Sequence, residues 1–306
     1  MPRLCIMRRL CGCMIWASAV AFAQSPEAGR VERDGSHGTL VVDSSRPVDS
    51  AAITIAEHFG VPVNSEDPPY VYKDDVKDVT ADAWRRLHPS ERALIPKGGR
   101  LEVQFALHPD GSPEDIRGLL RELIDTANGQ FPFGYRLDVD GDFFSLVPTH
   151  TRDLLGHVVE ITPLLDRRIT IPLGTRTVAE TVNLMTAQLS AQTGLHVSCC
   201  QAVVVGIPWG TKKVDFEAHD EPARTVLRRL IVSELQGRPN GYYWLQRCDP
   251  LPSQWCFINL MYLNRAKGTE PLQPGGQPPP QTSVPSNQRN PDGTSPWFSA
   301  APVSKK

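Results

Sequence analysis

The sequence predicts an α+β protein built from two tandem β-α-β-β-α-β-β modules, each a small sheet with helices on one face. Three observations support this. TIAEHFGVPV at residues 54–63 and QLSAQTGLHV at residues 188–197 both pass from a helix through a glycine into an apolar strand. Each is followed, directly or after an insert, by an alternating strand and a helix with one apolar stripe. Each half then ends in a hairpin, so we expect modules at residues 38–150 and 157–264.

The first half begins with the strand TLVVD, and residues 48–59 form a short helix that Gly60 ends. RLEVQFAL alternates apolar and polar residues, which is typical of a strand with one buried face. The run from Ser112 to Asp115 then offers an N-cap, a proline at the first helical position and acids in the first turn. The stripe of this helix comprises Ile116, Leu119, Leu120, Leu123 and Ile124. YRLDV and DFFSLVP close the half as a hairpin.

The second half repeats this order. RITIPL reads as a strand, Gly194 ends the helix that follows, and LHVSCC is the next strand. KVDFEAHD alternates, and Pro222 stands near the start of a second helix. GYYWLQRC and WCFINLMYL complete a hairpin rich in aromatic residues. The two helical stripes comprise Val178, Val182, Met185 and Leu189, and Ala223, Val226, Leu227, Leu230 and Ile231.

The stripes require a sheet to cover them. Burying one such apolar side chain is worth about 1.5–3 kcal/mol, so four or five per helix favour helices layered on strands. HTRDLLG, at residues 150–156, is the expected connection between the modules.

The first half exceeds the second by a long segment at residues 65–98. It carries a proline pair, several acids and the aromatic residues Tyr70, Tyr72 and Trp84. Long loops are often functional, and tyrosine and tryptophan are common interface anchors, so these three are candidate partner-binding residues. The alternative is that the aromatic residues tuck onto the domain and the acids are simply solvated.

The N-terminus is typical of a secretory signal. Basic residues precede an apolar run that ends in Ala21-Phe22-Ala23, so we expect residues 1–23 to be removed between Ala23 and Gln24. A bilayer span needs roughly 20 continuous apolar residues, and no later segment supplies them. The mature chain should therefore start with a linker at residues 24–37, lack a transmembrane segment, and be periplasmic or secreted.

Four of the seven cysteines lie beyond the signal, all in the second half, where they would meet an oxidising compartment. Adjacent residues of a strand point to opposite faces, which disfavours a bridge between Cys199 and Cys200. Cys248 and Cys256 flank the proline-bearing loop of the last hairpin, and we favour a disulfide between them. The alternative is four buried or unpaired thiols. A bridge over so short a loop should contribute about 2–3 kcal/mol.

Charge and composition limit the partners. The 32 basic and 34 acidic residues nearly cancel, so nothing favours nucleic acid or an anionic membrane surface. Residues 265–306 are rich in proline, glycine, glutamine and serine, a composition typical of disorder.

Two acidic motifs could suggest chemistry. Asp138, Asp140 and Asp142 fit the start of a calcium loop, but the required later glycine and glutamate are missing, and Asp140-Gly141 favours a two-residue hairpin turn. EAHDE at residues 217–221 could hold an acid and a base, yet an acid leading into a helix is ordinary there. No nucleotide-binding or hydrolase motif occurs, so we expect no cofactor, no metal site and no catalytic residue.

The order of elements, and the pairing of TGLHV with the downstream VDFEAHDEPARTVLRRL, resemble the short N-terminal domain shared by secretins and TonB-dependent receptors. The residues that match its second helix are Asp220, Pro222, Ala223, Val226, Leu227 and Leu230. The resemblance covers most of residues 169–250 and, more loosely, 38–148. It implies a periplasmic domain that docks onto partner proteins, and no catalytic residue, because these are packing residues. No pore or receptor barrel follows here.

These observations favour an exported, non-catalytic protein that docks onto cell-envelope proteins through residues 65–98 and open sheet edges. One alternative is a periplasmic or secreted hydrolase, in which two or more of five histidines would approach acids or a serine in a pocket. Another is small-ligand binding in an apolar cavity between the modules, near residues 151–168. The five histidines are His58, His108, His157, His196 and His219.

Overall fold

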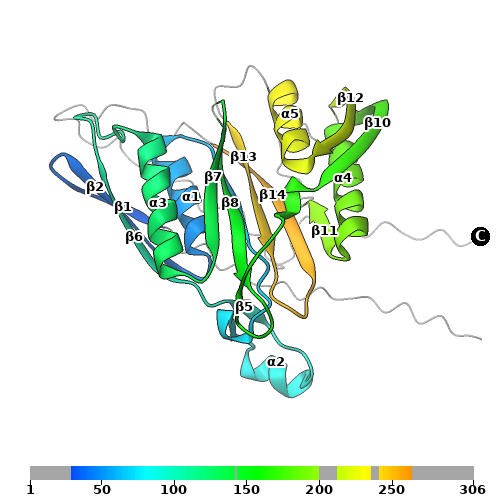
Figure 1. The fold of residues 1–306 in the computed structure, drawn as a ribbon, viewed down its shortest axis with the longest axis horizontal. Helices are drawn as coiled ribbons and strands as arrows, with labels where there is room; N and C mark the ends of the chain where they lie inside the picture. The colour runs from blue at the N-terminus through cyan, green and yellow to red at the C-terminus, as the bar shows by residue number, and fades with distance from the viewer. Residues whose placement is uncertain (1–28, 142, 200–211, 236–240, 264–306) are drawn as a thin grey trace, which may run out of the picture. The chain divides into compact units, whose positions relative to one another are not determined.

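The computed structural model describes residues 29–141, 143–199, 212–235 and 241–263 (Figure 1). Helices combine with antiparallel and mixed sheets, which confirms the α+β class. All of the described residues belong to one compact unit. The predicted signal with its cleavage point, and the predicted disordered tail, lie outside the described residues.

The first half contains the expected elements plus one strand before them. Pro47 opens the first helix at its N-terminus, and Gly60 ends it with a left-handed φ of 68°. The elements are β1 (Arg30–Asp34), β2 (His37–Ser44), α1 (Pro47–Phe59), β3 (Val63–Glu66), β6 (Gly99–Ala106), α3 (Ile116–Gln130), β7 (Gly134–Asp140) and β8 (Phe143–Arg152).

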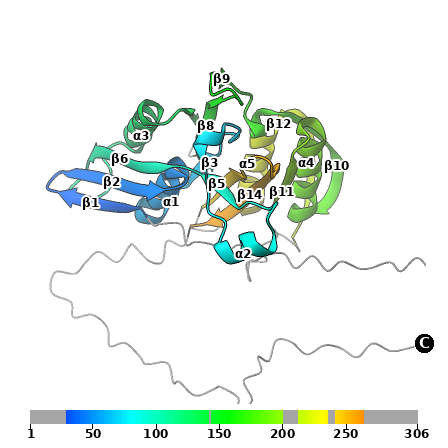
Figure 2. The ribbon, with the colours of Figure 1, turned by 90° about the horizontal axis from the view of Figure 1, so that it is seen from below.

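The insert between β3 and β6, predicted as a long loop, contains regular structure. It forms η1 (Lys73–Asp75), β4 (Val76–Asp78), α2 (Asp82–Leu87) and β5 (Leu94–Pro96), and β4 pairs antiparallel with β5. α2 projects from the body of the described chain at the bottom of Figure 1 and again at the lower edge of the folded part in Figure 2.

The second half follows the predicted order. Thr177 and Glu180 form a reciprocal capping box at the start of its first helix, and Gly194 ends that helix with a φ of 72°. The elements are β9 (Val158–Glu160), η2 (Leu164–Asp166), β10 (Arg168–Thr177), α4 (Val178–Thr193), β11 (His196–Cys199), β12 (Lys213–Pro222), α5 (Ala223–Leu235), β13 (Tyr242–Cys248) and β14 (Trp255–Tyr262).

Two helix starts lie later than the sequence signals placed them. α3 begins at Ile116, with Asp115 rather than Ser112 as its N-cap; the Asp115 carboxylate accepts the Arg117 N–H at 2.9 Å. α5 begins at Ala223, whose N–H bonds the Arg167 carbonyl at 2.9 Å, and Asp220 still belongs to β12. Before α5 the strand β12 runs up to Pro222, whereas before α3 the chain first makes a turn in which Leu107 bridges Pro113.

The strands pair in the same way in the two halves. In the first, β2 pairs antiparallel with β6, while β3 pairs in parallel with β8, which pairs antiparallel with β7. In the second, β10 pairs antiparallel with β12, while β11 pairs in parallel with β14, which pairs antiparallel with β13. Each half therefore supplies one antiparallel pair and one three-stranded ribbon, and in the first half β1 adds to the pair by running antiparallel to β2.

One pairing joins the two ribbons. β13 of the second half runs parallel to β3 of the first, with Leu245 opposite Ser65 and Gln246 opposite Glu66. We call this pairing the central junction. It creates a single sheet with the order β11-β14-β13-β3-β8-β7, and β9 pairs with the end of β8. The halves are thus not separate sheets connected by residues 150–156, as the sequence suggested, because these two strands pair directly.

The helices of the two halves lie on opposite faces of this shared sheet. Tyr243 and Leu245 of β13 pack with Ile53 of α1. Trp244, between them, lies in the core formed with α4 and α5. Since successive residues of a strand point to opposite faces, each half places its helices on the face that the other half leaves bare.

Within each half the helices lie between two sheets, which differs from the expected arrangement on one face of one sheet. The core of the first half combines Leu40 of β2 and Val103 of β6 with Leu120 of α3 and Val63 of β3. α1 is buried at every position from Pro47 to Ala56. Its buried polar residues are satisfied locally or across the sheet: the Asp49 carboxylate accepts from Arg247, and the Thr54 hydroxyl donates to the Ser50 carbonyl.

Candidate functional site

The turn between β8 and β9 presents the most exposed pair of neighbouring apolar residues in the described chain. Leu154 and Leu155 are 72% and 77% exposed, and Val158 beside them is also exposed. The turn is fixed by Asp153, whose carboxylate accepts the N–H groups of Leu155 at 2.8 Å and His157 at 2.9 Å. The backbone that carries these leucines is therefore fixed by two hydrogen bonds to one side chain.

The insert braces this turn from one side. The ring of Tyr72 packs so closely on Gly156 that a Cβ there would lie 2.9 Å from Tyr72 Cζ. The guanidinium of Arg152 lies 4.5 Å from the centre of the same ring and forms an ion pair with buried Asp75. We call Tyr72, Leu154, Leu155 and Val158 the turn patch.

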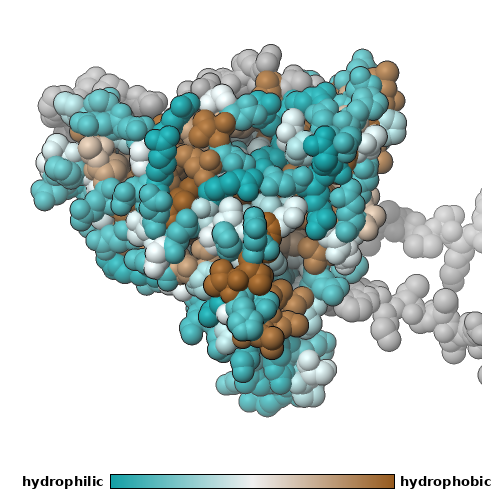
Figure 3. Space-filling view, in the orientation of Figure 1, coloured by the Kyte–Doolittle hydropathy of each residue, from teal (hydrophilic) through white to brown (hydrophobic). Residues whose placement is uncertain are grey.

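The surface around the turn between β8 and β9 is visibly hydrophobic. Figure 3 shows brown, hydrophobic surface gathered above α2, where Figure 1 draws the turn between β8 and β9. Contiguous exposed apolar surface rimmed by polar residues often marks an interaction site. Residues 150–156 were predicted only as a connection between the modules, so Leu154 and Leu155 were not among the candidate binding residues. Two adjacent leucines in a connecting segment were nevertheless a signal that could have identified them.

The three predicted partner-binding residues lie in different environments. Tyr70 is buried, donates to Asp67 at 3.2 Å and packs edge-to-face on Phe133, so for this residue the alternative holds that it tucks onto the domain. Tyr72 belongs to the turn patch. Trp84 lies on α2, partly exposed and stacked on His88 with ring centres 4.0 Å apart. The structure therefore brings Tyr72 to the candidate surface, buries Tyr70 and places Trp84 on the projecting helix.

A partly buried ionic cluster ties α5 to the first half across the central junction. Arg224 lies against Glu66 of β3 with two hydrogen bonds of 2.7 and 2.9 Å, and it also contacts Asp138 of β7 and Asp166. Glu66 is fully buried, and burial raises its pKa although Arg224 opposes the rise. Arg136 completes the cluster by binding Asp138 and Asp166.

A second cluster lies at the other end of the junction. Asp67 accepts the Arg46 guanidinium at 2.7 Å, the Tyr70 hydroxyl at 3.2 Å and the Cys248 N–H at 3.2 Å. Nearby, Asp49 of α1 accepts the Arg247 guanidinium of β13 at 2.9 Å. The cavity beside this cluster measures about 20 Å³, room for about one water molecule. It is a structural cluster and does not provide the ligand cavity considered above.

Asp49 gives stability a pH dependence that can be measured. Its carboxylate is fully buried, and desolvation raises its pKa to about 6 despite Arg247. Between about pH 4 and pH 6 the folded protein then binds more protons than the unfolded chain, so the free energy of unfolding falls as pH rises. The contribution amounts to about 3 kcal/mol over this window.

Urea unfolding at pH 4.5 and pH 7 tests this. Asp49→Asn should show a smaller difference in the free energy of unfolding between these two pH values than the wild type does. Asp125→Asn, at an exposed position on α3, should show the same difference as the wild type. An Asp49→Asn protein with the wild-type pH dependence would show that this carboxyl titrates normally.

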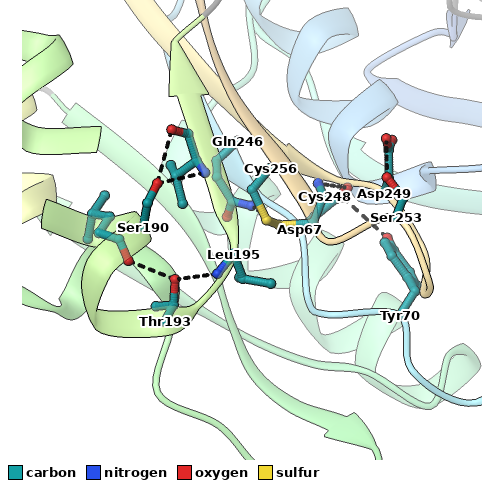
Figure 4. Close-up of a disulfide and its surroundings, with 12 residues drawn as sticks. Asp67, Tyr70, Ser190, Thr193, Leu195, Gln246, Cys248, Asp249, Ser253 and Cys256 are labelled. Carbon is teal, nitrogen blue, oxygen red and sulfur yellow. Dashed lines mark hydrogen bonds between the residues drawn. A yellow bond between two sulfur atoms is a disulfide. The ribbon is translucent and has the colours of Figure 1, made fainter. Parts of the chain in front are cut away.

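The predicted disulfide between Cys248 and Cys256 is confirmed, and it closes the hairpin of β13 and β14 (Figure 4). The two residues stand directly opposite each other in the antiparallel pair. Figure 4 also shows Asp67 reaching the backbone of Cys248, which places the bridge next to the second cluster. Cys199 ends β11, and Cys200 lies outside the described residues.

The histidines do not converge on a pocket. All five candidates are exposed, and their acidic neighbours are local in sequence: His157 lies 3.3 Å from Asp153, and His219 lies 3.2 Å from Glu217. Within the described ranges, no group of three or more histidine, cysteine, aspartate or glutamate side chains is arranged to hold a metal ion. Gly141 has the left-handed φ of 62° expected at the hairpin turn that follows Asp140.

Comparison of the chain with protein-family models, with curated proteins and with solved structures gave no match. The resemblance to the short domain of secretins and TonB-dependent receptors thus stays a prediction. In the described part of the chain, no helix is both long and apolar enough to cross a membrane.

Proposed function

We propose that this is an exported, non-catalytic docking protein of the cell envelope, whose turn patch binds a partner protein. The observation that carries the proposal is the exposure of Leu154 and Leu155 on a turn that Asp153 and Tyr72 hold rigid. A preformed loop loses little conformational freedom on binding, so its apolar area contributes efficiently to affinity. The proposal includes two related modules as the scaffold, and the matching strand pairing of the two halves supports this.

Export is part of the same proposal. The predicted signal at residues 1–23 and the disulfide between Cys248 and Cys256 support it, because disulfides persist in oxidising compartments. The partner class follows from charge: basic and acidic residues balance, and the candidate surface is apolar, which favours a protein over nucleic acid.

A photo-crosslinking residue placed at position 155 in cells tests the proposal. We expect one dominant crosslinked product with an envelope protein, and none from position 173, where exposed Leu173 of β10 provides a matched control. With the purified partner, Leu154→Asp/Leu155→Asp should weaken binding by about a hundredfold, or about 2.7 kcal/mol, and Leu173→Asp should not. Equal binding by both variants would exclude the turn patch.

A deletion of the insert would be a poor test of docking. Residues 68–84 include Tyr70 and Asp75, which are buried and bonded to the rest of the fold. Removing them would destabilise the sheet, so point changes on the exposed turn separate binding from folding.

A further inference from the structure

β7 forms one outer edge of the shared sheet, and it pairs with β8 alone among the strands that the structure describes. Tyr135 shows which of its backbone groups point away from β8. Its N–H donates to the Asn128 side chain of α3 at 2.7 Å, and its C=O accepts from that side chain at 3.0 Å. Backbone directions alternate along a strand, so the N–H and C=O groups of Leu137 and Val139 point the same way as those of Tyr135. An open edge of this kind can accept another strand.

The central junction shows how such an edge is filled. β13 holds the place in the second half that β7 holds in the first, and the strand registers make Gln246 the equivalent of Leu137. β3 runs parallel to β13, and the N–H of Asp67, which directly follows β3, donates to the C=O of Gln246 at 2.8 Å. The equivalent C=O on β7 belongs to Leu137. A parallel strand can therefore be added to β7 in the same register.

The helix beside each edge also corresponds. IRGLLRELI, residues 116–124 of α3, aligns without gaps with ARTVLRRLI, residues 223–231 of α5, and the buried leucines of α3 fall on buried positions of α5. This alignment places Arg117 at the position of Arg224. At the junction Arg224 holds Glu66 of β3, the added strand, with hydrogen bonds of 2.7 and 2.9 Å. Arg117 thus stands where an arginine binds the added strand in the other half.

The side of α3 that carries this arginine faces the open edge. α3 runs beside β7 (Figure 1). Arg117, Arg121 and Asn128 are spaced by four and seven residues, so they share one side of the helix. Asn128 marks the direction of that side, because it bonds the outward backbone of Tyr135. Both arginines are exposed, and neither forms a side-chain ion pair within the described ranges.

We propose that an extended acidic segment of a partner protein binds as a parallel strand at the open edge of β7. Its backbone bonds the outward groups of Leu137 and Val139. One of its acids is held by Arg117 as Glu66 is held by Arg224 at the junction. An arginine binds a carboxylate through two parallel hydrogen bonds, which fixes the register of the segment. The inference rests on the proposed docking function, but this surface shares no residue with the turn patch, so each surface can fail its own test.

A synthetic peptide of residues 61–68, VPVNSEDP, is the probe, because it reproduces the segment that fills the equivalent edge inside the chain. With the peptide blocked at both ends and labelled with a fluorophore, anisotropy should show saturable binding to the protein with a Kd below about 1 mM. Arg117→Glu should weaken this binding at least about tenfold, whereas Arg86→Glu, at an exposed position of α2, should bind like the wild type. The absence of saturable binding, or equal binding by both variants, would overturn the proposal.

Charge reversal and a proline substitution test the geometry. A peptide carrying Glu66→Arg should bind Arg117→Glu at least about fivefold more tightly than it binds the wild type. Val139→Pro should weaken binding of the unmodified peptide at least about tenfold, because proline removes an outward N–H at an exposed edge position. Circular dichroism checks the folding of each variant, and the charge reversal decides by itself if Val139→Pro does not fold.

The two docking surfaces are distinguished by one further variant. Leu154→Asp/Leu155→Asp should bind the peptide like the wild type, because the turn patch lies apart from β7. A reversed peptide that gains nothing from Arg117→Glu contradicts strand addition at this edge, whatever the crosslinking at position 155 shows.

Discussion

Replacing Arg224 with methionine is expected to lower the free energy of unfolding by about 3–5 kcal/mol, one of the two largest effects in this protein. Arg224 is 13% exposed, and it balances Glu66, which is not exposed at all, together with Asp138 and Asp166. Removing the cation leaves a carboxylate buried without its partner. That loss costs far more than the attraction of a surface ion pair.

Urea denaturation of Arg224→Met beside Arg168→Met measures the difference. Arg168 pairs with Asp220, and both side chains are largely exposed, so its replacement should cost no more than about 1 kcal/mol. Adding Glu66→Met to Arg224→Met should recover most of the stability, since the buried charge then disappears. A double variant as unstable as Arg224→Met alone would mean that the arginine acts through packing rather than through charge.

Asp67→Ala is the second change with a large expected effect, about 3 kcal/mol or more. Asp67 is buried and accepts from the Arg46 guanidinium, the Tyr70 hydroxyl and the Cys248 N–H. Its loss strips three donors of a partner in a region that admits about one water molecule. The insert is anchored through Tyr70, so this variant should also expose residues 68–98 to proteolysis.

Asp125→Ala provides the control, because Asp125 is exposed on α3 and its replacement should change stability by less than about 0.5 kcal/mol. Limited proteolysis and urea unfolding should agree for Asp67→Ala. An intact insert together with a loss of less than about 1 kcal/mol would remove Asp67 from its anchoring role.

Much of the architecture could be predicted from the spacing of apolar residues and from the glycines that end helices. The stripes of α3, α4 and α5 and the glycines after α1 and α4 identify helices that the structure contains. The pairing of Cys248 with Cys256 followed from their positions on two strands of one hairpin. These are local features, which short stretches of sequence determine by themselves.

The central junction could not be predicted, because it depends on contacts between residues far apart in sequence. No local feature of the β3 sequence VNSE indicates that this strand pairs with β13. The structure buries all four of its residues, which is unusual for so polar a strand. Glu66 and Asn64 are buried because the second half covers them, with Arg224 and Trp244 supplying their partners.

The candidate surface was predicted only in part for a related reason. Aromatic residues of the insert were judged by type, and the structure buries Tyr70 because Asp67 and Phe133 are placed beside it by other elements. Tyr72 belongs to the turn patch because its ring packs on Gly156, a contact that sequence alone does not reveal. Exposure is decided by tertiary packing, so residue type indicated the region but not the contact residues.

Hydrogen exchange of the protein and of its Arg224→Met variant is the most direct test of whether the two halves share one sheet through β13 and β3. If the sheet is shared, peptides covering residues 63–66 and 242–248 open together in the wild type, and both lose protection by the same free energy in the variant. Lost protection in residues 242–248 alone, with residues 63–66 unchanged, would contradict the shared sheet.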